Sequence, residues 1–371
     1  MIRVAWAGLL LGLTGCDLFP GLLSDLRVDE PTEVPVSDTG GFVDFVVKVP
    51  DSPVGTMAWC GEYGDDVLGT VWQVTDPSGE VVYSGYDPEA SVFRADTVDD
   101  LAAALFPSTP QLPLTGGDWE VQWFIGAGNP GMVECGAIHR AGSPSNNVSV
   151  RVEVVLVGLD VDAAAAQTDP NLAQAIDQLT LEWQTAGLTP DVRWRDFEGD
   201  VDRFAVVDVD TNSGDYREFN DLLRTSDPSN DATLTFFLVQ ELRDVLGGTL
   251  LGLAAGPPGA AGLHGTSKSG VVVTAADLAM APTDVGKIMA HEGGHFLGLY
   301  HTTERRGTRH DPLLDTPECP SSADSDNNGR LSVAECAGQG GENVMFWTLT
   351  EGTSTLTTDQ AYVLGRNPIA R

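Results

Sequence analysis

Eleven consecutive residues, HEGGHFLGLYH at 291–301, constrain the structure of this 371-residue chain more than any other stretch. His291 and His295 are four residues apart, so a helix places both imidazoles on the same face. Gly298 allows the backbone to leave that helix sharply, and the turn can bring His301 back towards the other two histidines. The stretch therefore predicts a helix, a tight turn and three converging imidazoles.

Three histidines are a typical ligand set for a zinc ion that keeps its fourth position open for water. Bound zinc lowers the pKa of that water to about 7 and polarises the carbonyl that the water attacks. Glu292 lies beside the first ligand, where it can take a proton from the water without binding the metal. An HExxH pentapeptide alone also occurs by chance in surface helices, but the glycine and third histidine at fixed offsets argue against chance. We therefore expect zinc at His291, His295 and His301, with Glu292 as general base and then acid. The remaining histidines are expected to be ordinary polar residues: His139, His264 and His310.

A second candidate metal site is residues 324–335, DSDNNGRLSVAE, which match the twelve-residue calcium loop of EF-hands. Such a loop binds calcium through side-chain oxygens, one backbone carbonyl, one water-mediated contact and a final bidentate carboxylate. The corresponding residues here are Asp324, Asp326, Asn328, Arg330, Ser332 and Glu335. No helix pattern precedes the loop, so we expect an EF-hand-like calcium loop and not an EF-hand. The alternative is a solvated acidic loop without an ion.

The amino terminus is typical of a bacterial export signal. A basic start, MIR, precedes an apolar run at 4–13 that is too short to span a bilayer. The run ends in LTGC at 13–16, which resembles a lipobox, in which the cysteine carries the lipid. We expect residues 1–15 to be removed and Cys16 to anchor the mature chain to a membrane of a bacterial cell envelope, on its periplasmic face or at the cell surface. A plain secretion signal with an incidental cysteine is the alternative.

The four other cysteines form an even set in a chain bound for an oxidising compartment, which favours disulfides. Three pairings are possible. We favour Cys60–Cys135 and Cys319–Cys336, because each pair then lies within one expected domain. In a less favoured alternative, Cys60 would cap the catalytic metal as a cysteine switch and leave Cys135 unpaired.

The charge balance excludes several partners. Asp and Glu number 54 against 20 Lys and Arg, a formal charge of -34, which repels nucleic acid and anionic lipid. No apolar run reaches the roughly 18 residues that a membrane-spanning helix requires. We therefore expect no nucleic-acid partner, and membrane contact through the lipid anchor only.

The pattern along the chain predicts a multidomain protein. Residues 16–38 are acidic and contain prolines, as in a tether, and residues 39–146 have the short β-branched and aromatic runs of a β-sandwich. This β-domain could bind a ligand or a cell-wall polymer, or be a spacer that packs on the next domain. Residues 147–371 alternate strands and helices, which predicts an α/β or α+β domain with a twisted, mostly parallel sheet. Its expected strands are 148–157, 192–197, 234–239 and 271–274, with helices from 170 and from about 283 and a Gly/Pro-rich loop at 247–270.

The zinc motif resembles that of the metzincin metallopeptidases, HExxHxxGxxH followed by a methionine turn. Asn343-Val344-Met345 fits such a turn, and DTPEC at 315–319 is similar to a segment of pappalysin-type members. The resemblance covers roughly residues 148–371 and implies a substrate cleft between a sheet with two long helices and a smaller carboxy-terminal part. Family members often have a tyrosine two residues after the methionine, where this chain has Trp347. The resemblance therefore carries no tyrosine role over to this chain.

Together these observations predict an exported, lipid-anchored zinc endopeptidase that acts on polypeptides. Calcium would be a structural ion in an insertion at 319–336. The rival interpretation is a non-catalytic surface binding protein or adhesin whose metals are only structural. An intact Glu292 argues against it, because a structural zinc site needs no base and usually takes a fourth protein ligand. Hydrolysis of a non-peptide amide is a third possibility.

Overall fold

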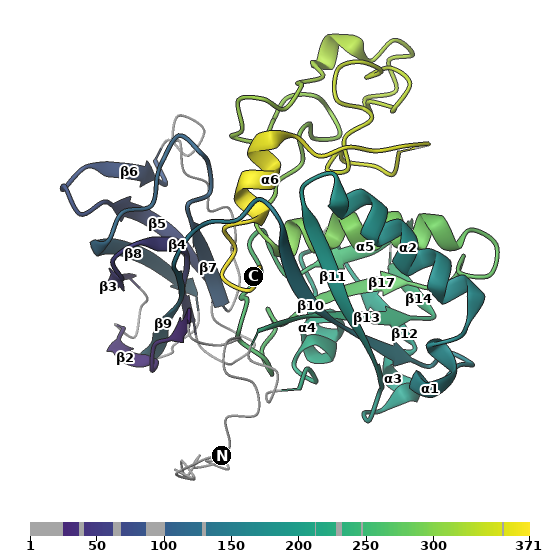
Figure 1. Cartoon of the computed structure of the whole chain (residues 1–371), viewed down its shortest axis with the longest axis horizontal. Coiled ribbons are helices and arrows are strands. Elements are labelled where there is room, and N and C mark those ends of the chain that lie inside the picture. Colours follow the sequence, from purple (N-terminus) through teal and green to yellow (C-terminus); the bar gives the residue numbers. More distant parts are fainter. Residues whose placement is uncertain are drawn as a thin grey trace.

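The computed structural model describes residues 25–36, 41–61, 68–86, 101–127, 131–211, 213–227, 232–245, 248–350 and 352–371. The expected signal peptide and Cys16 lie outside these residues. The described part is mostly sheet with few helices, as expected of a multidomain α+β protein (Figure 1). No helix among the described residues is long and apolar enough to cross a membrane.

The amino-terminal part consists of two antiparallel sheets that enclose a common core. The first has the order β1-β9-β4-β7, with β2 also paired to β9, and the second has the order β3-β8-β5-β6. Between them lie large buried side chains such as Trp119, Trp123 and Phe106. The strands are β1 (Leu26–Val28), β2 (Thr32–Pro35), β3 (Gly41–Val49), β4 (Pro53–Gly61), β5 (Leu68–Thr75), β6 (Val81–Ser84), β7 (Leu101–Phe106), β8 (Gly117–Ala127) and β9 (Met132–Ala141).

Two of these strands lie in the segment 16–38 that the sequence assigned to a tether. β1 and β2 both pair antiparallel with β9. Their side chains are mostly exposed, so their backbone hydrogen bonds hold them in place and no hydrophobic alternation marks them in the sequence. The tether expected at 16–38 is therefore corrected: the segment joins the first sheet from Leu26 to Pro35.

The remainder of the chain is built on a second architecture. Its main sheet has the order β11-β10-β13-β17-β16, in which only the edge strand β16 runs antiparallel to its neighbour. A small sheet, β12-β14-β15, lies beside it. The strands are β10 (Val148–Val157), β11 (Leu188–Asp196), β12 (Val206–Val209), β13 (Thr233–Val239), β14 (Glu241–Asp244), β15 (Gly248–Leu250), β16 (Gly252–Ala254) and β17 (Val271–Thr274). The helices are α1 (Ala163–Ala166), α2 (Pro170–Gln184), α3 (Val201–Phe204), α4 (Arg217–Leu223), α5 (Pro282–Phe296), the 3-10 helix η2 (Ser321–Ala323) and α6 (Thr358–Leu364).

The two long helices, α2 and α5, lie side by side against the main sheet (Figure 1). Asp169 caps α2 by accepting hydrogen bonds from two backbone N–H groups of its first turn, and Pro170 starts the helix with a fixed φ. The buried stripe of α2 includes Leu172, Leu179 and Trp183. The helices approach closely at Gly286 of α5, where a Cβ atom would lie 2.2 Å from the carbonyl oxygen of Ala175.

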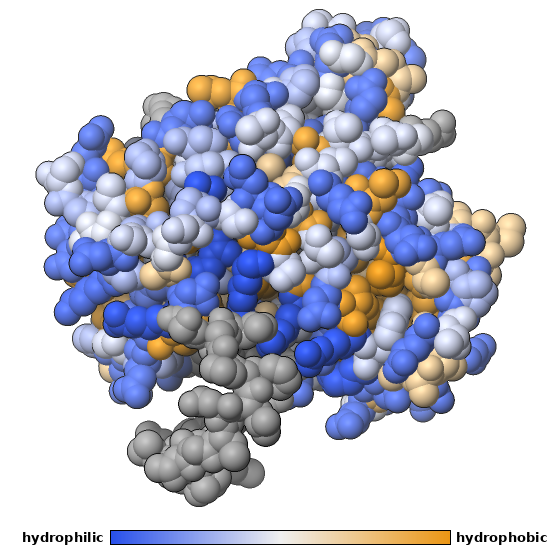
Figure 2. All heavy atoms as spheres, in the orientation of Figure 1, coloured by the Kyte–Doolittle hydropathy of each residue, from blue (hydrophilic) through white to orange (hydrophobic). Residues whose placement is uncertain are grey.

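The amino-terminal and carboxy-terminal parts share one hydrophobic core. Met57, Trp59 and Leu105, on the outer face of the first sheet, belong to the same buried cluster as Leu299 and Val363. The strands β4 and β7 are therefore covered by apolar side chains on both faces. The face of the molecule in Figure 2 is predominantly hydrophilic, in keeping with the high net charge.

Candidate metal centre and active site

The three histidines of the motif converge at the end of α5. The Nε2 atom of His291 lies 3.2 Å from that of His301 and 3.1 Å from that of His295. The third separation, between the Nε2 atoms of His295 and His301, is also 3.1 Å. Three nitrogens bound to one tetrahedral zinc ion, at about 2.0–2.1 Å each, would lie about 3.3–3.4 Å apart. The spacing of the imidazoles thus fits one zinc-sized cation.

Each imidazole is oriented by a hydrogen bond at its other nitrogen. Nδ1 of His291 lies 2.7 Å from the carbonyl oxygen of Val344, and Nδ1 of His295 lies 2.7 Å from that of Leu299. A carbonyl oxygen only accepts, so these Nδ1 atoms carry the proton and the Nε2 lone pairs face one another. Nδ1 of His301 similarly lies 3.1 Å from Oε1 of Glu304. Three lone pairs that meet without a proton between them fit a metal ion and not a hydrogen-bonded cluster.

Burial favours the neutral form of His291 and His295, the form that binds a metal. Desolvation, reinforced by the neighbouring His301, lowers the pKa of His291 to about 3. Desolvation and the two neighbouring imidazoles also lower the pKa of His295 well below its ordinary value.

Two adjacent glycines of the motif, Gly293 and Gly294, leave room for large side chains beneath the histidines. A Cβ atom at Gly293 would lie 2.6 Å from the Trp183 ring of α2. A Cβ atom at Gly294 would lie 2.6 Å from Sδ of Met345, which is fully buried. Met345 lies in a turn that Asn343 fixes by accepting a hydrogen bond from its backbone N–H at 2.8 Å. The expected methionine turn and the helix are therefore in direct contact.

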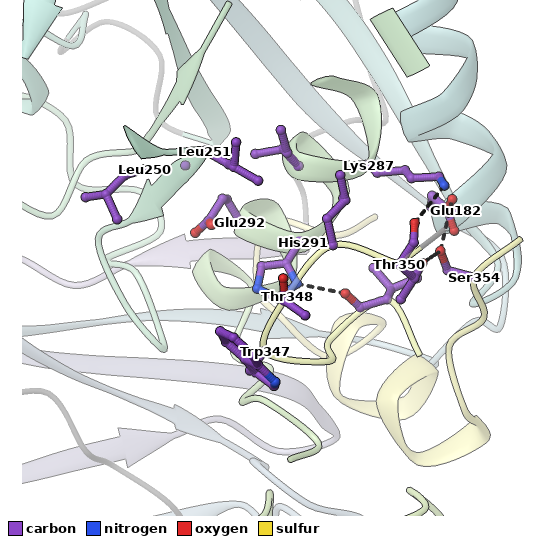
Figure 3. A pocket seen from close by; sticks show the side chains of 14 residues that line it. Glu182, Leu250, Leu251, Lys287, His291, Glu292, Trp347, Thr348, Thr350 and Ser354 are labelled. Atoms are coloured by element: carbon purple, nitrogen blue, oxygen red, sulfur yellow. Dashed lines mark hydrogen bonds between the residues drawn. The ribbon is translucent and has the colours of Figure 1, made fainter. Parts of the chain in front are cut away.

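Glu292 points into a pocket beside the histidines (Figure 3). Desolvation raises the pKa of its carboxyl to about 8. A hydrogen bond from the backbone N–H of Ala254 acts in the opposite direction and is the weaker effect. A Cβ atom at Gly252 would lie 2.5 Å from Cγ of Glu292, so the edge strand β16 runs directly past this side chain. Because β15 and β16 lie within residues 247–270, the expectation of a loop there is corrected. These strands are three residues long and rich in glycine, so they give no strand pattern.

The pocket has a volume of about 260 Å³ and extends from Glu292 and His291 to a polar end (Figure 3). Leu250, Ile288 and Leu349 are among its apolar walls. At the end away from Glu292 lie Glu182, Lys287, Thr350 and Ser354. Nζ of Lys287 donates to the carbonyl oxygens of Thr350, at 3.0 Å, and Gly352, at 2.7 Å. The pocket thus combines an apolar wall with a charged end next to the histidine cluster.

The acidic loop at 324–335 brings three carboxylates together. The oxygens of Asp324, Asp326 and Glu335 lie within 4.8 Å of one another. Ser325 donates hydrogen bonds to Oε1 of Glu335, and Ser332 donates hydrogen bonds to Oε2. These bonds lower the pKa of the Glu335 carboxyl to about 2. Gly329, at φ 77°, makes the sharp turn and donates to Asp324 at 2.9 Å. The preceding structure is the single turn of η2, in keeping with a loop that lacks an EF-hand helix.

Two other expected ligands of this loop, Asn328 and Arg330, are joined to each other. Oδ1 of Asn328 accepts the backbone N–H of Arg330 at 2.7 Å. The loop is tied to the pocket by Trp347, whose Nε1 donates to the carbonyl oxygen of Leu331 at 2.8 Å and whose side chain also lines the pocket. Trp347 thus connects the loop to the pocket beside the histidines.

The cysteines pair as the sequence favoured, Cys60 with Cys135 and Cys319 with Cys336. Cys60 is buried in its disulfide, so it has no free thiol to cap a metal. Two of the histidines outside the motif lie in other hydrogen-bonded surroundings: His139 contacts Thr56 and Asp29, and His310 contacts Thr303.

Sequence reasoning missed Glu304, which orients the third histidine. The sequence does place an acidic residue three positions after His301, a spacing at which a carboxylate can reach Nδ1 of the histidine. This spacing could have identified Glu304. Sequence reasoning also missed Asp311, whose buried carboxyl accepts hydrogen bonds from Thr316, at 2.5 Å, and the backbone of Leu313. No spacing in the sequence predicts that burial.

No family model and no curated protein matches this chain. Among solved structures it is similar to metalloproteinase-II from Bacteroides fragilis, with 13% identity over 48% of this chain and 58% of that one, and a TM-score of 0.30. It is also similar to xylanase 10B of Clostridium thermocellum (CBM22-1 and GH10 modules), with 10% identity over 41% of this chain and 33% of that one, and a TM-score of 0.14. Neither likeness indicates a function for this chain.

Proposed function

We propose that this chain is a zinc-dependent endopeptidase, exported and held at a membrane by a lipid on Cys16. The observation that carries the proposal is the convergence of three Nε2 atoms, 3.1–3.2 Å apart, beside the pocket into which Glu292 points. In the same proposal, residues 39–146 form a β-sandwich domain and residues 147–371 a catalytic domain of metzincin type, most similar to pappalysins.

The roles of the residues follow from their positions. Bound zinc, held by His291, His295 and His301, would acidify water and polarise the scissile carbonyl. A carboxylate oxygen of Glu292 would take the proton of the attacking water and deliver it to the leaving nitrogen. Glu304 would hold His301 in the tautomer that presents Nε2. An intact base at this position is not needed for a structural metal site, which is why we favour a hydrolase over a binding protein.

A polypeptide substrate is favoured by the edge strand β16. It pairs with β17 on one side, and its residue Gly252 lies against the side chain of Glu292. An extended peptide can add to such an edge through main-chain hydrogen bonds, which places its carbonyl groups near the base. A side chain of the substrate would then enter the pocket lined by Ile288 and Leu349.

Calcium in the 324–335 loop would be a structural ion. The proposed ligands remain Asp324, Asp326, Asn328, Arg330, Ser332 and Glu335. The clustering of three of their carboxylates supports the site, and the hydrogen bond from Trp347 to Leu331 would transmit the order of the loop to the wall of the pocket.

A peptide-cleavage assay tests the proposal. The Cys16→Ser chain, loaded with zinc, is incubated with a proteome-derived peptide library, and the products are identified by mass spectrometry. We expect internal cleavages that a zinc chelator abolishes and added zinc restores. A zinc-loaded protein that cleaves no peptide would contradict the proposal and favour the binding-protein interpretation.

A further inference from the structure

An aromatic cluster lies on the outer face of the second amino-terminal sheet, away from both cores. Phe42 of β3 lies opposite Phe124 of β8 in the strand register, with ring centroids 5.4 Å apart. Trp72 of β5 contacts both rings, at 5.6 and 5.9 Å, and Tyr86 packs against Trp72 at 4.9 Å. The cluster therefore joins side chains from three adjacent strands and the segment after β6.

These aromatic side chains lie outside the hydrophobic core of the domain. The inward-facing residues of the same strands, such as Val43 and Trp123, already form the core. By contrast, Tyr86 is 83% exposed, Phe42 52% and Phe124 36%. Large apolar groups gathered on a soluble surface mark interaction sites more often than isolated ones do.

The same sheet face continues from the aromatic cluster into hydrogen-bonding groups. In the register, Asp44 lies opposite Gln122, two residues along from Phe42 and Phe124 and thus the next pair on this face, and Gln122 lies opposite Gln73. Nε2 of Gln122 donates to Oδ1 of Asp44 at 2.8 Å, which orients both side chains. With Thr75 and Glu120 these residues line a hollow of about 360 Å³.

The alternation of aromatic and amide groups matches the chemistry of sugars. A pyranose ring presents C–H bonds on its faces, which pack on aromatic rings, and hydroxyl groups at its rim, which both donate and accept hydrogen bonds. Amides and carboxylates offer both kinds of partner to such hydroxyls. Ligand-binding sites in general combine apolar side chains, which contact the ligand, with a few polar groups that fix the orientation of the ligand.

Charge decides between this occupant and a lipid surface. Asp44 and Glu120 line the hollow on the same sheet face, and the chain carries a formal charge of -34, so anionic headgroups, nucleic acids and acidic peptides would be repelled. A neutral glycan meets no such repulsion and can use the carboxylates as acceptors.

We propose that this face, formed by Phe42, Trp72, Tyr86 and Phe124 with Asp44 and Gln122, binds a neutral polysaccharide chain. The site lies in the β-domain, outside the histidine site, and does not depend on the proposed peptidase activity.

Affinity electrophoresis of the Cys16→Ser chain tests the proposal. The native gels contain hydroxyethyl cellulose, xyloglucan, galactomannan or pullulan as soluble neutral glycans, and a gel without glycan gives the reference mobility. We expect at least one glycan to retard the wild-type chain. Trp72→Ala should weaken binding by at least about tenfold, as a central aromatic contact does. Tyr86→Ala, at a position too exposed to affect folding, should weaken glycan binding less. Gln122→Ala should also weaken glycan binding, because it removes a hydrogen-bonding partner for the sugar hydroxyls.

The matched control is Met280→Ala, which removes another exposed apolar side chain, at 88% exposure, and should leave the retardation unchanged. Thermal melts establish that each variant is folded. Absence of retardation by every glycan would overturn the proposal. So would flotation with phosphatidylcholine vesicles that Trp72→Ala abolishes while no glycan binds, which would assign the face to lipid. Loss of a dimer in the Trp72→Ala variant, again without glycan binding, would assign it to self-association.

Discussion

The Leu105 side chain of β7 packs directly on Gly298, the last glycine of the histidine motif at 291–301. A Cβ atom at Gly298 would lie 2.5 Å from Cδ2 of Leu105, and its φ of +112° lies in a region that other residues rarely adopt. Gly298 starts the turn that brings His301 back to His291 and His295. The amino-terminal part thus supports the turn on which the metal site depends.

Shortening Leu105 should therefore weaken metal binding. Leu105→Ala leaves a cavity under the turn, and we expect a loss of stability of about 2–5 kcal/mol together with roughly tenfold weaker zinc binding, measured by competition with a chromophoric chelator. Leu101→Ala is the matched control, because Leu101 is also buried on β7 and belongs to the same cluster. It should lose comparable stability and keep its zinc affinity. Equal zinc affinity in the two variants would show that the contact has no role at the metal site.

The stability of the folded chain should depend on pH through Asp311. Desolvation raises the pKa of its carboxyl from 3.8 to about 7, with Asp315 and Glu318 adding to the shift. Between about pH 4 and 7 the folded state holds this proton and the unfolded state has lost it. The contribution of Asp311 to the unfolding free energy therefore falls as the pH rises, by up to about 1.4 kcal/mol per pH unit. Asp311→Asn removes this pH-dependent contribution. The melting temperature of the variant, relative to that of the wild type, should therefore increase from pH 4 to 7. A constant difference would refute the shift.

Calcium should stabilise the protein through Glu335. An ion that binds only the folded chain adds about 2.7 kcal/mol at a hundredfold excess over its Kd, so the melting temperature should rise with added calcium. Glu335→Gln should remove most of the rise, because this residue would supply the bidentate carboxylate. Glu318→Gln, an exposed position outside the loop, serves as the control and should respond as the wild type does. An undiminished calcium response in Glu335→Gln would place the ion elsewhere.

Membrane attachment should depend on Cys16. Cys16→Ser removes the thiol that would carry the lipid, so the protein should move to the soluble fraction and lose fatty-acid labelling. Cell fractionation with immunoblotting measures the first effect and metabolic labelling the second. Membrane association that persists in the variant would rule out the lipid anchor.

The sequence predicted those elements that have a clear local pattern of residues. The strand expected at 148–157 coincides with β10, and the helix expected from 170 coincides with α2, since a cap, a proline and an apolar stripe all agree. The strands β4 and β7 have no comparable pattern, for a physical reason. They are covered on both faces, so they show continuous burial without alternation, and the LAAALF of β7 favours a helix by composition.

The site was predictable to the same degree. The offsets within 291–301 identify the residues that converge, because a helix and a glycine turn fix their directions. What orients them comes from elsewhere in the chain: the carbonyl of Val344, the carboxylate of Glu304 and the side chain of Leu105. Contacts of this kind depend on the tertiary packing, which local spacing does not encode.

The most direct test of the account separates metal binding from catalysis at Glu292. Glu292→Gln keeps the three histidines, so elemental analysis should still find about one zinc per chain, whereas His295→Ala should lose both zinc and activity. Proton transfer by a positioned side chain is worth about 10²- to 10⁴-fold in rate. We therefore predict that zinc-loaded Glu292→Gln cleaves peptides at least about a hundredfold more slowly than the wild type. Cleavage by zinc-loaded Glu292→Gln at the wild-type rate would contradict the account.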